Sequence, residues 1–360
     1  MAAMTSLQAI PKVELHVHLE TSLRLRRLAE QTHPGRSPFS GEPHLIADPG
    51  AFTGYDRLRR LRYAGRAGRI PDEVYTSENI TRITSDLLAA AAAQNVRYVE
   101  VRVGGRRGFT ALGVRGMLEA MAQAAEEAER PLGIRSAFLV TLVRERGPEE
   151  AEAIVTEAAA CRDLRVVGVD LAGDEANYPP AMFMRAVDKA RSAGLGITVH
   201  AGEFTGPTSI WIAIHQLGAE RIGHGIRAVE DPELITYLRG HRVTLEICPT
   251  SNIRLGLAPS VAEHPIRALL AAGVPVTVNS DDPMLLDTDI TRELASVRDA
   301  LRLDGDALAT LIRNAARAAF LPAADRVALE REMTPAAASS SAAPAPRQRK
   351  HQARPEQSDN

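Results

Sequence analysis

Eight short apolar runs rich in β-forming residues recur along the chain, and segments with helical periodicity separate them. Strands that alternate with helices predict a parallel sheet. Eight such units are the number that closes a (β/α)8 barrel of the TIM type. The alternation alone leaves an open, doubly wound sheet as the alternative. The runs are Val13–Leu19, Val96–Val103, Ile134–Val143, Val166–Leu171, Gly196–Val199, Arg221–Gly223, Val243–Ile247 and Val274–Val278.

The connection between the first two runs, Thr21–Gln94, has room for more than one helix. Gln31–Gly54 is rich in Pro, Gly and Ser and is expected to be a loop, whereas Leu58–Ala64 and Asp72–Ala93 are expected to be helices. This is where a barrel enzyme would place a lid over its active site, and an inert surface insertion is the alternative interpretation.

The two ends of the chain differ from its middle. The pattern after Leu286 is helical to about Glu332, but Pro335–Asn360 has almost no apolar bulk and is expected to be disordered. Residues 1–334 are therefore expected to form one barrel domain, followed by a tail over residues 335–360. Helical periodicity is also found in Val114–Ala128, Glu149–Ala160, Ala181–Ala193 and Ile266–Ala272.

The composition narrows the class of partner. A formal net charge of −2 indicates neither a nucleic-acid nor a membrane partner. The longest apolar run, Leu87–Ala93, is too short to cross a bilayer, and Met1–Ile10 lacks the features of a signal peptide. The two cysteines, Cys161 and Cys248, form no Cys-x-x-Cys pair, which favours a reduced, cytoplasmic setting.

Histidines and an aspartate follow the ends of four of the predicted strands. His16 and His18 lie two residues apart at the end of the first strand, so both imidazoles can face one metal ion. His200 ends the fifth strand, His224 ends the sixth, and Asp281 follows the eighth. The carboxyl ends of all barrel strands meet at one rim, so we expect these side chains to converge there.

Three of these four imidazoles and the carboxylate would be ligands typical of a catalytic zinc site that keeps one position open for water, and the residues by themselves leave His224 as a possible ligand. The metal would lower the pKa of that water from about 16 toward about 7. Iron, cobalt and manganese accept similar ligands. The fourth strand ends in Asp170-Leu171-Ala172-Gly173, without a lysine that could be carbamylated to bridge two metals, so a single metal ion is favoured.

Six segments of the chain, in the same order, resemble the adenosine deaminase family of the amidohydrolase superfamily. The resemblance spans about residues 10–330 and implies a TIM-type barrel. The segments are Pro11–Glu20 (PKVELHVHLE), Val169–Glu175 (VDLAGDE), His200–Glu203 (HAGE), Arg221–Gly225 (RIGHG), Cys248–Asn252 (CPTSN) and Ser280–Pro283 (SDDP).

The resemblance implies roles for the residues of these segments. Glu203 would protonate the purine N1, and His224 would orient the attacking water and accept its proton instead of binding the metal. Asp282 would contact N7, and the backbone of Gly173 would contact N3. One zinc ion per chain would be held by His16, His18, His200 and Asp281.

One segment departs from the family pattern. Family members commonly have Asp or Glu and then Gly after the second histidine, whereas this chain has Glu20-Thr21. The acid reaches the sugar in adenosine deaminases, where it is usually Asp; Glu is more typical of adenine and aminodeoxyfutalosine deaminases. Glu20 is therefore a candidate substrate-binding residue beside the sugar. Arg106 and Arg107 are candidates for an anionic substituent, with a solvated loop as the alternative.

The resemblance thus implies zinc-dependent hydrolytic deamination of a small-molecule 6-aminopurine nucleoside, such as adenosine or deoxyadenosine, to the 6-oxo product and ammonia. Adenine and aminodeoxyfutalosine are the alternative substrates. A catalytically inert purine-binding relative and a hydrolase of amide or ester bonds are the alternatives from other classes. The inert relative would be expected to have lost at least one of the chemical residues, and the chain retains all of them.

Overall fold

The computed structural model describes residues 7–19, 72–104 and 106–333, and it confirms the barrel. Eight parallel strands pair in the order β1-β2-β3-β4-β5-β6-β7-β8. The chain after β8 meets β1 again, where the N–H of His18 donates to the carbonyl of Asp281 at 2.9 Å. The strands are β1 Lys12–His18, β2 Val96–Val103, β3 Arg135–Val143, β4 Val166–Ala172, β5 Gly196–Ala201, β6 Arg221–His224, β7 Thr244–Ile247 and β8 Val276–Val278.

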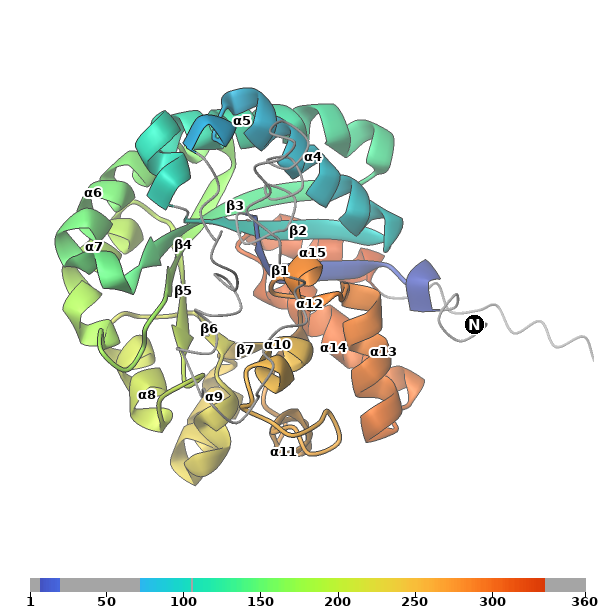
Figure 1. The fold of residues 1–360 in the computed structure, drawn as a ribbon. Coiled ribbons are helices and arrows are strands. Elements are labelled where there is room, and N and C mark those ends of the chain that lie inside the picture. Colours follow the sequence, from blue (N-terminus) through green and yellow to red (C-terminus); the bar gives the residue numbers. More distant parts are fainter. Residues whose placement is uncertain (1–6, 20–71, 105, 334–360) are drawn as a thin grey trace, which may run out of the picture.

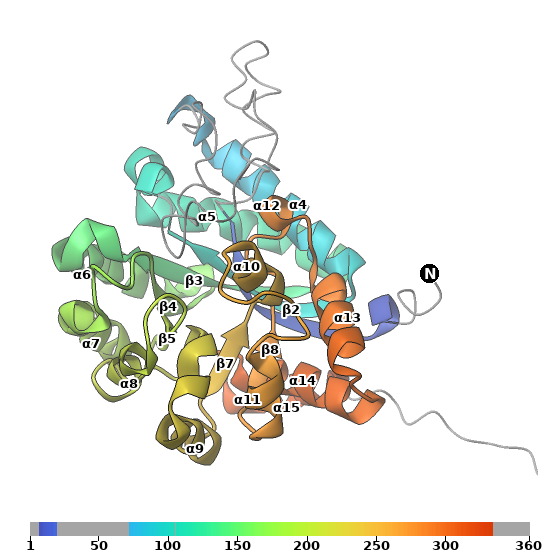
Figure 2. The ribbon, with the colours of Figure 1, turned by 60° about the horizontal axis from the view of Figure 1, so that its bottom comes forward.

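Helices surround the strands, as Figure 1 shows, and they cover the apolar outer face of the barrel. The short helices α10 and α12, which follow β7 and β8, lie side by side in both views (Figures 1 and 2). The helices are α4 Ser77–Ala93, α5 Arg106–Leu132, α6 Gly147–Ala159, α7 Met184–Ser192, α8 Pro207–His215, α9 Pro232–His241, α10 Pro249–Arg254, α11 Ile266–Ala271, α12 Pro283–Leu286, α13 Ile290–Leu301, α14 Gly305–Ala318 and α15 Ala323–Glu332.

The inner face of the barrel is ionic, which the alternating sequence of β2 explains. Successive residues of a strand point to opposite faces. Val99, Val101 and Val103 belong to the apolar core, whereas Glu100 and Arg102 between them are fully buried and paired with charged residues of β6 and β7. Because β2 is not adjacent to β6 or β7 in the sheet, these contacts cross the interior of the barrel.

Several helix boundaries differ from the expectation. The helix expected over Asp72–Ala93 is a short 3-10 turn followed by α4, because Thr76 is extended and its hydroxyl accepts the N–H of Asn79 as an N-cap. The helical region expected after Leu286 is divided into α13, α14 and α15, and the left-handed backbone of Arg302 ends the first of these. The expected segments Gln31–Gly54, Leu58–Ala64 and 335–360 lie outside the described residues.

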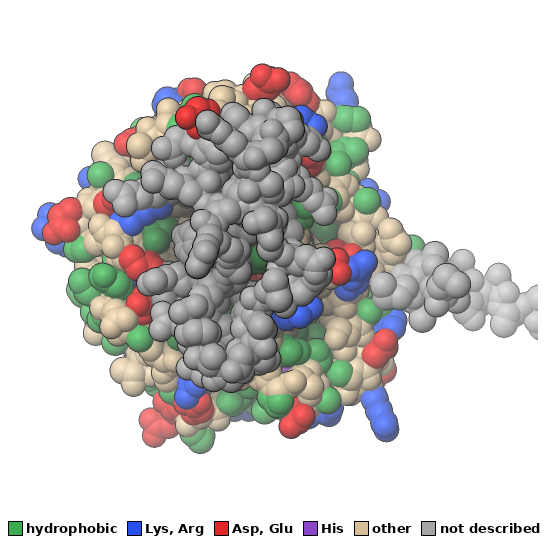
Figure 3. All heavy atoms as spheres, in the orientation of Figure 1, with side chains coloured by type: hydrophobic (Ala, Val, Ile, Leu, Met, Phe, Trp, Pro, Cys, Tyr) green, Lys and Arg blue, Asp and Glu red, His purple; other side chains and the backbone are tan. Residues whose placement is uncertain are grey.

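The described surface around the barrel end in Figure 3 carries acidic and basic side chains side by side. Neither sign forms a continuous patch among the described residues of that face, in keeping with the formal net charge of −2. Within the described ranges, the structure contains no helix of the length and apolar character needed to span a membrane.

Candidate active site

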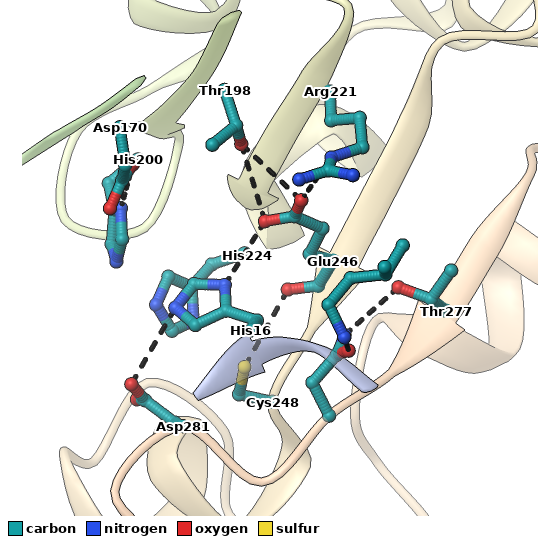
Figure 4. A network of polar contacts seen from close by, with 12 residues as sticks. His16, Asp170, Thr198, His200, Arg221, His224, Glu246, Cys248, Thr277 and Asp281 are labelled. Atoms are coloured by element: carbon teal, nitrogen blue, oxygen red, sulfur yellow. Dashed lines mark hydrogen bonds and ion pairs between the residues drawn. The ribbon is translucent and has the colours of Figure 1, made fainter. Parts of the chain in front are cut away.

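Three imidazoles converge where β1 and β5 end. The ligand atoms of His16, His18 and His200 all lie within 4.8 Å of one another. Asp281 reaches the same point from the loop after β8, with Oδ1 at 3.6 Å from His16 Nε2 and 3.4 Å from His18 Nε2. Figure 4 shows Asp281 and His200 on different sides of His16. The structure therefore brings together all four residues for which the sequence suggested metal ligation.

His224 and Glu203 lie beside this cluster. The ring of His224 is centred 4.9 Å from that of His16 and 5.1 Å from that of His200. Its Nε2 lies 3.6 Å from Oε1 of Glu203, and both residues are buried. An imidazole and a carboxylate in this arrangement can hold or exchange a proton at the edge of the histidine cluster.

Two residues of the site adopt a left-handed backbone. His224 and Asp281 each have a φ of 60°, a region in which a non-glycine residue costs about 1–3 kcal/mol. The hydrogen bond that Asp281 N–H donates to the His16 carbonyl at 3.0 Å holds this conformation in place. His224 is the last residue of β6, and Asp281 lies in the loop after β8, so both left-handed residues lie at the carboxyl end of the barrel strands.

Two buried carboxylates within the barrel contact the Nδ1 atoms of His16 and His200. Glu246 Oε2 lies 3.2 Å from His16 Nδ1, and Asp170 Oδ1 lies 2.9 Å from His200 Nδ1. Both pairs are visible in Figure 4. Such contacts place the proton on Nδ1 and leave Nε2 as the lone pair that binds a metal. Arg102 lies between the two carboxylates, hydrogen-bonded to Glu246 and 3.6 Å from Asp170.

The ionic network continues toward the opposite end of the barrel. Arg221 contacts Glu246 Oε1 at 2.7 Å and donates to Glu100 Oε2 at 2.6 Å. The other oxygen of Glu100 accepts the hydroxyl of Tyr98 at 3.0 Å. All four side chains are buried, so each charge depends on its partners for compensation.

Burial controls the charge of the cluster. It lowers the pKa of His16 far below the usual value, with a further decrease from the Arg102 charge, and it lowers the pKa of His224. Neutral imidazole is the form that binds metals. Burial also raises the pKa of Cys248 well above its usual value, so this thiol, whose sulfur is near His16, His224 and Asp281, stays protonated.

Glu175 organises the loop that carries Glu203. Its buried carboxylate accepts the backbone N–H groups of four successive residues, Gly202 to Thr205, at 2.5–3.2 Å. The Glu203 side chain thereby projects from a loop whose backbone donors are all directed to a single carboxylate. Glu175 is thus a structural support for the residue expected to carry the proton.

Asn252, on the short helix α10 after β7, bridges two histidines. Its Nδ2 lies 3.2 Å from His224 Nδ1, and its Oδ1 lies 3.2 Å from His264 Nε2. His264 in turn accepts the backbone N–H of Ile266 at Nδ1, at 3.0 Å. All three polar side chains are buried.

Two glycines leave room that the site needs. A Cβ on Gly223 would lie 3.1 Å from His200 Nδ1 and 3.3 Å from His16 Cε1, so the two rings occupy the space of the missing side chain. Gly173 has a φ of 116°, and a Cβ there would lie 2.1 Å from the carboxylate of Glu145. Asp282 is buried at the start of α12. Glu20 and Thr21 lie outside the described residues, as do the side chains of Arg106 and Arg107.

The supporting residues are not among the site residues expected from the sequence. The period-2 alternation of charged and apolar residues in β2 is a signal for Glu100 and Arg102, and isolated acids in otherwise apolar strands are a signal for Asp170 and Glu246. Glu175 and Asn252 lie within two of the six segments that resemble the family, and this is the signal that could have found them, whereas His264 lies in a loop where no periodicity identifies it.

Comparison with known proteins identifies the class. The family model for adenosine deaminase matches residues 11–335. An aminodeoxyfutalosine deaminase of Streptomyces avermitilis is 35% identical over 90% of each chain. An adenosine deaminase of Klebsiella pneumoniae is 37% identical over 89% of this chain and 97% of its own.

Solved structures agree with this. The adenine deaminase of Arthrobacter aurescens superposes with a TM-score of 0.78 at 28% identity, covering 90% of this chain and 98% of its own. A zinc-bound amidohydrolase of Burkholderia ambifaria gives a TM-score of 0.79 at 25% identity over 92% of both chains. The chain belongs to the adenosine deaminase family, and it is a hydrolytic, metal-dependent deaminase.

Proposed function

We propose that this chain removes the 6-amino group of a purine nucleoside, converting adenosine or deoxyadenosine to inosine or deoxyinosine and ammonia. The observation that carries the proposal is the convergence of His16, His18 and His200 within 4.8 Å of one another, with Asp281 beside them. In the proposal these four residues hold one zinc ion.

The buried donors fit such an ion. His16 Nε2 has no hydrogen-bond partner among the described residues, although it is fully buried and faces the cluster. Leaving a buried polar atom without a partner costs about 1–3 kcal/mol, which a metal bond would offset. Imidazole nitrogens and one carboxylate oxygen form a donor set that zinc prefers, and zinc would supply a Lewis acid that makes water nucleophilic near neutral pH.

The remaining residues act on the purine and its protons. Glu203 and His224 are the two groups placed to hold or move protons, because they lie 3.6 Å apart at the edge of the cluster. Protonation of N1 by Glu203 would make C6 electrophilic. The buried Asp282 would bind N7, and the Gly173 backbone would bind N3, while Glu20 would contact the sugar side.

Adenine and aminodeoxyfutalosine are the alternative substrates, favoured by the relatives of about 35% identity that carry those activities. A panel of adenosine, deoxyadenosine, adenine and aminodeoxyfutalosine, assayed by ammonia release, distinguishes the three. We expect the highest kcat/KM for a nucleoside. A preference for free adenine would reject the nucleoside assignment, and no turnover of any member would reject the function.

Two substitutions test the assigned roles separately. Glu203→Gln should retain zinc and lose most of the turnover, because the amide cannot deliver a proton. Asp281→Ala should also lower the zinc content, measured by elemental analysis, because it removes a ligand. Full activity of the first variant, or full zinc occupancy of the second, would contradict the corresponding role.

A further inference from the structure

A chain of hydrogen bonds leads from the backbone N–H of Ile266 through His264 and Asn252 to His224, and the backbone group determines which atom donates at each step. The N–H of Ile266 can only donate, so His264 Nδ1 must accept with its lone pair. A neutral imidazole carries one proton, which must then be on Nε2. Burial lowers the pKa of His264 to about 4, so the ring is neutral near pH 7.

The same reasoning passes through Asn252. Because His264 Nε2–H donates, the Asn252 atom that faces it must be the accepting oxygen, as observed at 3.2 Å. The Asn252 amide nitrogen therefore faces His224 Nδ1 and donates to it, also at 3.2 Å. Reversal of the amide would set two donors or two acceptors against each other in a site where all three side chains are buried.

We propose that Asn252 and His264 are positioning residues that fix His224 in the tautomer with its proton on Nε2. This inference rests on the proposed function, and it deepens the role of His224. Nδ1 is occupied by the amide donor, so Nε2–H points to the reaction site as a hydrogen-bond donor. It faces Oε1 of Glu203 at 3.6 Å.

The tautomer decides which group accepts the proton of the attacking water. Neutral His224 has no free lone pair on Nε2, so Glu203 is the acceptor and His224 donates a hydrogen bond to the attacking oxygen. Glu203 first gives its proton to N1 and becomes the carboxylate that can accept. As the O–C6 bond forms, the O–H bond breaks and its proton moves to Glu203. Glu203 then gives this proton to the amine and takes the remaining hydroxyl proton as the C6=O bond forms, the C6–N bond breaks and ammonia leaves. This differs from the role of proton acceptor that the resemblance implies for His224.

The tautomer is measurable without substrate. Long-range ¹H–¹⁵N spectra of the zinc-loaded protein labelled at histidine distinguish Nε2–H from Nδ1–H, and the signals of His224 are assigned by their loss in His224→Gln. We expect Nε2–H for both His224 and His264. An Nδ1–H signature for His224 would overturn the proposal, whether or not the protein turns over a purine.

Asn252→Asp gives a kinetic test, because a carboxylate accepts from both rings and reverses the tautomer of His224. If the donor at Nε2 is needed, kcat should fall about 100-fold, the effect of losing one preorganised donor, while KM and zinc content change little. If His224 must instead accept a proton, the same variant should keep or exceed the wild-type kcat, which would refute the proposal.

A pair of substitutions at His264 separates the effect of the hydrogen-bond direction from the effect of side-chain packing. His264→Gln can still donate to Asn252 Oδ1 and should retain kcat within a few-fold and the Nε2–H signature of His224. His264→Leu cannot donate and should lose both. Equal kcat and equal spectra for these two variants would also overturn the proposal. His241→Gln is the control, because His241 is exposed on α9, where its ring stacks on Tyr237 and its Nδ1 contacts the carbonyl of the same residue.

Discussion

Replacing Glu246 with glutamine tests how the barrel interior supports the site. Glu246 is fully buried and contacts His16 Nδ1 at 3.2 Å, Arg221 Nε at 2.7 Å and the guanidinium of Arg102. Glutamine has the same shape but no charge, and its NH2 group would face N–H donors of His16, Arg102 or Arg221 instead of accepting from them. Removing one partner of a buried ion pair costs about 3–5 kcal/mol. Loss of the carboxylate behind a ligand histidine weakens metal binding by about 10–100-fold.

Two measurements separate these effects. Urea unfolding of the metal-free protein reports the cost of the broken ion pairs, because bound zinc would itself stabilise the folded state. Competition with a chelator reports the loss of zinc affinity. The matched control is Glu332→Gln, which removes an exposed carboxylate 2.8 Å from Arg135 and should cost no more than about 1 kcal/mol. Equal losses of unfolding free energy in the two variants would refute the reasoning.

Three further predictions concern the shape, support and pH dependence of the site. Gly223→Ala should lower the zinc affinity measured by competition with a chelator, because the added methyl group would crowd two imidazoles. The control Gly240→Ala adds a methyl group in open space on α9, so it should leave the zinc affinity unchanged and raise the free energy of unfolding by about 0.4–1 kcal/mol. Equal zinc affinities of the two variants would contradict this prediction. Glu175→Gln should lower kcat with zinc retained, since four N–H donors lose their carboxylate; an unchanged kcat would remove Glu175 from the supporting role. His264 has the ordinary histidine pKa of 6.5 in the unfolded chain, whereas burial in the folded protein lowers that pKa to about 4. Between these two pH values the unfolded chain binds a proton that the folded protein does not. The free energy of unfolding should therefore decrease by about 3 kcal/mol as the pH falls from 6.5 to 4. The urea-unfolding free energy of His264→Gln should accordingly vary less over that range, and an equal slope would contradict the lowered pKa.

The barrel and the convergence of the proposed ligands were both predictable, for reasons that are local in sequence. Each strand is a compact apolar run, and the outer face of every strand must meet a helix, so the alternation gives the architecture. His16 and His18 share a face because they are two residues apart, and the common rim of a barrel brings His200 and Asp281 to them. The boundaries of the helices were less predictable, because single caps such as that of Thr76 decide them.

The sequence alone predicted the eight-stranded barrel and the residues that the structure brings together at the candidate metal site, because strand periodicity and strand ends are read from neighbouring residues. The class of reaction followed from the resemblance of six segments to a known family. Only the tertiary structure revealed the partners of those residues. Glu246 lies 230 residues from His16, and Glu175 lies 27 residues from Gly202, so no local pattern connects them. The direction of the bonds from Ile266 through His264 and Asn252 to His224 likewise depends on folded geometry, because a hydrogen bond specifies its donor only when both groups are in place.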